Sequence, residues 1–180
     1  MPGRDEPVPS SPGPVRTRAV RHLPREQLLF GGTYGLVLSS ALIAALENPG
    51  EEPDPASDLL WVLLTTAATA AAHGYAHVIA RRAAARGETT VRALRTMLAE
   101  WPLVAAALPT AVLLSVAVAG WWEESDAVAA ALWFNTVALF AWGAWAARVA
   151  GRGWPGSFLS GGVDLVIGLV IVVANAMSHA

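Results

Sequence analysis

The twelve basic residues of this chain are all arginines, and they are confined to three segments. These segments are the first 27 residues, the stretch 81–95 and the stretch 148–152. Long apolar stretches separate them, and the connectors 47–58 and 121–126 contain acidic residues but no basic one. Connectors rich in arginine stay in the cytoplasm when a membrane protein inserts. The alternation therefore predicts five membrane crossings, with the N-terminus in the cytoplasm and the C-terminus outside.

The balance of apolar and charged residues excludes an ordinary soluble domain. Hydrophobic residues make up 54% of the chain and charged residues 14%, whereas an average soluble domain has roughly 25% charged residues. Five apolar runs of about 19–22 residues each have the length that a helix needs to cross a hydrocarbon core roughly 30 Å thick. We therefore predict an all-α polytopic protein of the cell (inner) membrane, with spans at 28–46, 59–80, 101–120, 127–147 and 158–177.

The chain divides into two parts by composition. Residues 1–27 are rich in proline, arginine and serine, which is typical of a disordered segment, so we predict a disordered cytoplasmic tail at 1–27 and one membrane domain at 28–180. The connector 81–100 is compatible with a helix, because Val91, Leu94 and Leu98 recur at helical spacing. We expect this connector either to extend the second span or to lie in the headgroup region.

No motif in the sequence indicates an enzyme or a nucleic-acid-binding protein. The chain has no cysteine, which excludes disulfides and thiolate metal sites. It contains no phosphate-binding loop, nucleophile elbow or HExxH helix. Topology accounts for the arginines, so they do not indicate a nucleic-acid partner. The lipid bilayer is the predicted partner, and no resident cofactor is indicated.

Four ionisable side chains are predicted to lie towards the cytoplasmic side of the membrane. His73 and His77 are four residues apart on the second span and so share one helical face. Asp164 enters from the same side on the fifth span, and Glu100 lies at the inner mouth of the third. Such groups cost about 2.5–3.5 kcal/mol each on insertion scales. They could share a proton or hold a divalent cation. Alternatively, His77 and Glu100 are interfacial and reach the headgroups, while His73 and Asp164 form a structural hydrogen bond or make no contact.

Uncharged polar and small residues are predicted to join the helices. Asn135 on the fourth span and Asn175 on the fifth are expected to hydrogen-bond between helices rather than to bind ligands. Gly31 and Gly35 form a GxxxG pair in the first span, which permits another helix to approach closely. A homodimer through the first span is one arrangement that this pair permits.

Three stretches of the sequence carry a family resemblance. They are 30–40 (FGGTYGLVLSS), 74–82 (GYAHVIARR) and 139–144 (LFAWGA). They are similar to the opening helix, the end of the second helix and the closing pair of helices in the vacuolar iron transporter family. The resemblance implies five spans with a cytoplasmic N-terminus and proton-coupled transport of Fe²⁺ or Mn²⁺. This chain departs from the family at Tyr34, where the family has an aspartate, at Gly74, which has no glutamate beside it, and in lacking the long acid-rich cytoplasmic insert of eukaryotic members.

Two functions are compatible with these features. The first is an integral membrane protein with this fold that does not itself transport and has a structural or partner-binding role. Loss of the first-helix aspartate favours it, because hard divalent cations prefer carboxylate oxygens. The second is a divergent transporter that exchanges Fe²⁺ or Mn²⁺ for protons, with a new ligand set in place of the family's residues. That set would comprise His73, His77, Glu100 and Asp164.

Overall fold

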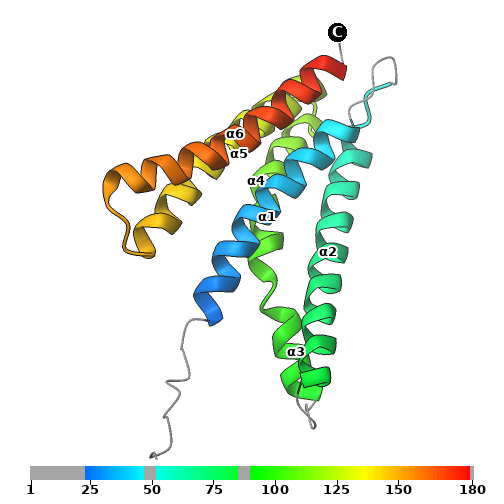
Figure 1. Cartoon of the computed structure of the whole chain (residues 1–180). Coiled ribbons are helices and arrows are strands. Elements are labelled where there is room, and N and C mark those ends of the chain that lie inside the picture. The colour runs from blue at the N-terminus through cyan, green and yellow to red at the C-terminus, as the bar shows by residue number, and fades with distance from the viewer. Residues whose placement is uncertain (1–22, 47–51, 85–89, 179–180) are drawn as a thin grey trace, which may run out of the picture.

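The computed structural model describes residues 23–46, 52–84 and 90–178, and these ranges contain helices and no strand. This confirms the all-α prediction. Figure 1 shows the helices packed into one bundle, with their bounds as follows. They are α1 (Leu23–Leu46), α2 (Pro55–Ala84), α3 (Thr90–Leu98), α4 (Trp101–Val118), α5 (Glu124–Val149) and α6 (Trp154–Ser178).

Five stretches of these helices are long and apolar enough to cross a membrane. They are Gln27–Leu46, Pro55–Arg82, Ala93–Val118, Glu124–Val149 and Trp154–Met177. Each coincides with a predicted span to within a few residues, except that the third includes most of α3. The helices extend beyond most of the predicted ends, because polar residues can continue a helix where it leaves the apolar layer.

The predicted boundary of the N-terminal tail is wrong. Helix α1 begins at Leu23 rather than after residue 27. Pro24 is tolerated there because the first turn of a helix needs no amide donor from proline, and Arg25, Glu26 and Gln27 are good helix formers. The remainder of the predicted disordered tail, 1–22, lies outside the described residues.

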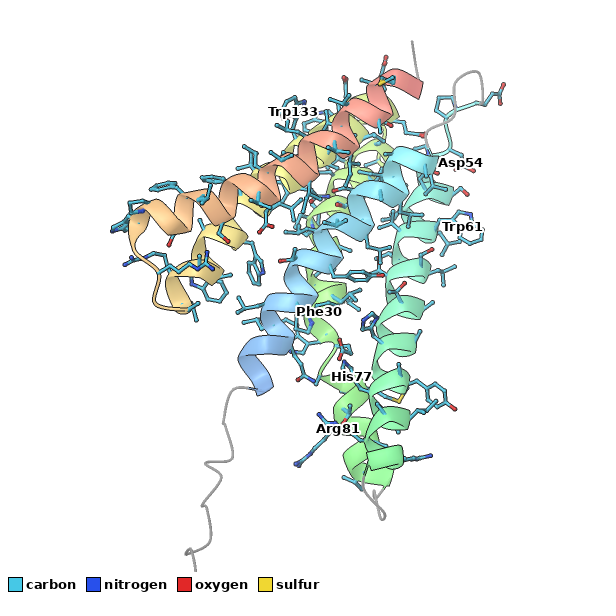
Figure 2. All side chains as sticks on the ribbon, viewed as in Figure 1. Phe30, Asp54, Trp61, His77, Arg81 and Trp133 are labelled. Carbon is cyan, nitrogen blue, oxygen red and sulfur yellow. The ribbon has the colours of Figure 1, made fainter. Side chains whose placement is uncertain are left out.

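The two ends of the bundle differ in charge. Figure 2 shows Arg81 and Asp54 at opposite ends of the bundle, near the two ends of α2. The end formed by the C-terminal part of α2 and by α3, here called the arginine end, carries Arg81, Arg82 and Arg95, and the end of α5 and the turn after it carry Arg148 and Arg152. The other, here called the acidic end, carries Glu52, Asp54, Asp58, Glu123, Glu124 and Asp126.

Helix α1 lies at the centre of the bundle and packs on α2, α4, α5 and α6. Gly31 and Gly35 face α4: a Cβ atom on Gly35 would lie 2.5 Å from the carbonyl oxygen of Leu103. Gly32 faces α5, where the ring of Trp142 covers it. The predicted close approach at the GxxxG pair is thus confirmed, but α4 of the same chain occupies that face. A homodimer stays a prediction and would need another surface.

Asn135 joins three helices, as predicted. Its side chain is 0% exposed, and its Nδ2 donates to Thr110 Oγ1 of α4 at 2.9 Å and to Ser40 Oγ of α1 at 3.0 Å. A third, longer contact reaches Ser39 Oγ at 3.4 Å. Asn175 lies partly buried near the end of α6, and its role in joining helices stays a prediction.

Candidate functional site

A row of polar side chains runs along α2 towards the arginine end. His73, His77 and Arg81 follow one another at intervals of four residues and therefore share one side of the helix. The ring of His73 lies 5.3 Å from that of Phe30 and 5.4 Å from that of Tyr34, both on α1. The rings of His73 and His77 are 6.3 Å apart. Figure 2 shows Phe30 and His77 on neighbouring helices, with Arg81 nearer the arginine end.

Glu100, just before α4, lies beside His77 of this row. It follows α3 directly and is the N-cap residue of α4, where unpaired backbone amides favour a negative charge. Glu100 is only 2% exposed, and its Oε1 lies 3.7 Å from Nε2 of His77. Within the described part of the chain this oxygen makes no hydrogen bond. The half-exposed imidazole of His77 is therefore the group placed to stabilise a charge on Glu100.

Small residues bring Glu100 into position. A Cβ atom on Gly74 would lie 2.6 Å from Cα of Met97, so the absence of a side chain at Gly74 lets α3 pack directly on α2. At helical spacing, Ala93, Thr96 and Glu100 then face α2, and all three are buried. In the sequence, only the family resemblance singled out Gly74. Its place one turn before the exposed His77 could have indicated a close helix contact.

The side chain of Asp164 does not lie beside that of His73. Its carboxylate lies between α5 and α6 against Gly143, where any side chain would collide with Oδ2. Helix α1 separates the two residues, because Gly32 on one side of α1 contacts Trp142 of α5 while Phe30 on the opposite side contacts His73. The prediction of one shared site for His73 and Asp164 is therefore wrong. Similar depth from one membrane face does not determine which helices are neighbours.

The described residues do not bring the four predicted ligands together as one group. Within 23–46, 52–84 and 90–178, no group of three or more His, Cys, Asp or Glu residues is placed to hold a metal ion. Tyr34 stacks on Phe30 with ring centroids 5.6 Å apart, and its ring is tilted by 48° to that of His73. Aromatic rings of α1 therefore surround the imidazole of His73.

Comparisons of the chain with protein-family models, with curated proteins and with solved structures give no match. The resemblance to vacuolar iron transporters therefore stays a prediction from the residues that carry it.

Proposed function

We propose that this chain is a multi-pass protein of the cell (inner) membrane that binds protons at its arginine end, which faces the cytoplasm. Its role is structural or partner-binding, and it does not carry metal ions itself. The observation that supports this proposal best is the 3.7 Å approach of His77 Nε2 to the buried Oε1 of Glu100. The three arginine-bearing segments support the orientation, since positively charged connectors stay inside.

The pair combines a buried acid with an accessible base. The side chain of His77 is 48% exposed, so water can reach it. Protonated His77 would attract the carboxylate of Glu100, whereas neutral His77 would not. Among the described residues, the ring of His73 lies 6.3 Å from that of His77, and Arg81 Nη1 donates to Thr96 Oγ1 at 3.5 Å. The contact between α2 and the start of α4 therefore depends on the charges of this pair.

A double-mutant cycle tests this pair. We expect His77→Asn and Glu100→Gln to be coupled at pH 5 and additive at pH 8, because only the protonated imidazole attracts the carboxylate. The coupling free energy should be on the order of 1 kcal/mol or less, since water screens the half-exposed imidazole. The measurement is unfolding of the purified full chain in detergent micelles at the two pH values.

Asp164→Asn provides the control for this cycle. Asp164 lies on the other side of α1 from His77, so its replacement should add to that of His77→Asn at both pH values. Equal coupling between His77 and Glu100 at pH 5 and pH 8, or no coupling at either, would contradict the proposal.

A divergent Fe²⁺ or Mn²⁺ transporter is the second candidate function. One observation favours it: His77 and Glu100 supply an imidazole nitrogen and a carboxylate oxygen at one place, and both are metal-ligand types. We expect liposomes containing the purified protein to show no more proton-coupled Fe²⁺ or Mn²⁺ flux than empty liposomes. Flux that is lost in His77→Ala and Glu100→Gln would establish the transporter instead. The variants His73→Ala and Asp164→Asn would show whether the remaining predicted ligands contribute.

A further inference from the structure

Helix α3 presents large apolar side chains outwards. Val91 is 69% exposed, Leu94 58% and Leu98 65%. The residues that α3 buries are small or polar, namely Ala93 and Thr96. If the outer face of this short helix contacted only water, we would expect leucine and valine to be buried and small or polar residues to be exposed, because burial of leucine and valine is favourable. The outer face of α3 therefore matches an apolar environment.

The three apolar residues form one continuous stripe. At 3.6 residues per turn, Val91, Leu94 and Leu98 fall within about 60° of one another around the helix axis. Ala93 and Thr96, which pack towards α2, lie on the opposite side. The stripe consequently points away from the bundle, and no described helix covers it.

Positive charge accompanies the stripe. Arg95 follows Leu94 in α3 and lies about 40° from Val91 around the helix axis, and it is exposed. Arg82, near the end of α2, is exposed as well. Guanidinium groups bind phosphates well, and juxtamembrane basic residues are attracted to anionic lipids. An apolar stripe bordered by arginine is the pattern of a helix that lies at the surface of an anionic membrane.

The position of α3 along the chain places it at the level of the lipid headgroups. The third apolar stretch, Ala93–Val118, runs through most of α3 and all of α4. Trp101, at the start of α4, is 60% exposed, and tryptophan prefers the membrane–water interface. Because α3 precedes Trp101 directly, its stripe lies beside the layer where acyl chains meet headgroups.

We propose that α3 docks onto the surface of an anionic lipid leaflet. Val91, Leu94 and Leu98 insert at the boundary of the acyl chains, and Arg82 and Arg95 bind lipid phosphates. This contact holds the α2–α3 pair, and with it Glu100, at a fixed depth. The inference does not rest on proton binding by His77 and Glu100, so either can fail without the other.

The absence of cysteine from the chain makes a direct test possible. A spin label is attached to Leu94→Cys in the full chain, reconstituted in vesicles of phosphatidylcholine and phosphatidylglycerol. Its collision rates with oxygen and with a water-soluble nickel chelate report the depth of the label. Val170→Cys, on an exposed position of α6 within a span, is the lipid-facing control. Pro53→Cys, at an exposed position just before α2, is the water-facing control.

We expect nickel collisions at Leu94→Cys to be several-fold lower than at Pro53→Cys, with oxygen collisions close to those at Val170→Cys. Vesicles of phosphatidylcholine alone should shift the label towards water, and adding Arg82→Gln and Arg95→Gln should abolish this lipid dependence. Nickel access equal to that at Pro53→Cys would overturn the proposal and leave the stripe for a soluble partner. Low access to both reagents, with dipolar broadening between labels, would overturn it in favour of a second copy of the chain.

Discussion

Gly35→Ala is expected to destabilise the bundle more than Gly31→Ala, the change at the other glycine of α1 that faces α4. A Cβ atom at this position would lie 2.5 Å from the carbonyl oxygen of Leu103 and 2.7 Å from Cβ of Ala106. The closest of these atoms belongs to the backbone of α4, so a side chain cannot simply rotate away. Helix α4 would have to shift, and we expect a loss on the order of 1–3 kcal/mol, the range typical of overpacked cores.

Gly162→Ala is the matched control for this change. Gly162 is also a helical glycine, but no atom lies within 4 Å of the Cβ position. Alanine favours a helix over glycine by roughly 1 kcal/mol in soluble hosts, so this variant should be neutral or slightly more stable. Unfolding of both variants in detergent micelles gives the comparison. Equal stability of the two variants would show that α1 and α4 are not packed at Gly35 as described.

The membrane spans could be predicted from the sequence because their signals are local. Length and hydrophobicity of a stretch such as 158–177 decide whether it can cross a membrane, without knowledge of its neighbours. The ends were less predictable: α1 continues to Leu23 and α5 to Val149, since helix propensity persists beyond the apolar layer. Sequence alone also left the place of the connector 81–100 open, which contains the separate helix α3.

Neighbouring helices could not be predicted, because depth in a membrane says nothing about position around the bundle axis. His73 and Asp164 were matched by depth alone, yet α1 lies between them. The decisive residues are small: Gly143 accommodates Asp164, and Gly74 accommodates Met97. His77 and Glu100 were both identified from the sequence, but their pairing depends on α3 packing against α2. Contacts of this kind depend on the packed bundle and leave no periodic pattern in the sequence.

The polar partners of Asn135 were also missed. Ser39 and Ser40 donate to the carbonyl oxygen of Leu36 at 3.2 Å and 2.8 Å, and this bond within α1 leaves their lone pairs free to accept from Asn135. Serine that bonds to its own helix needs no partner elsewhere, so neither serine was predicted to have a partner on another helix. The adjacent residues Ser39 and Ser40 in the middle of an apolar span were the sequence feature that could have indicated polar partners for Asn135.

Asn135→Leu is expected to destabilise the contact among α1, α4 and α5. It removes the contacts from Nδ2 to Thr110, Ser40 and Ser39 while keeping an apolar side chain in the core. Interhelical hydrogen bonds in membranes contribute about 0.6 kcal/mol each on average, and an amide nitrogen carries only two N–H groups, so the two shorter bonds predict a loss of about 1 kcal/mol. Unfolding of the purified protein by increasing fractions of sodium dodecyl sulfate in mixed micelles measures it.

Two further variants show whether the hydrogen bonds between helices are responsible. Ser115→Ala is the control, because Ser115 is exposed and donates only to the carbonyl oxygen of Val112 in its own helix; it should leave stability unchanged. Thr110→Val combined with Asn135→Leu should cost less than the sum of the two single changes, since the second change removes a bond already lost. Strict additivity would show instead that shape, rather than hydrogen bonding, holds α1, α4 and α5 together at Asn135.

The pH dependence of Asn135→Leu separates the two polar sites of the bundle. Asparagine, serine and threonine do not titrate in the physiological range, so the loss caused by Asn135→Leu should be the same at pH 5 and pH 8. Under the proposed proton binding, the coupling between His77 and Glu100 should differ between the same two pH values. A pH-dependent loss in Asn135→Leu would show that the two sites are linked and that protonation acts on the whole bundle.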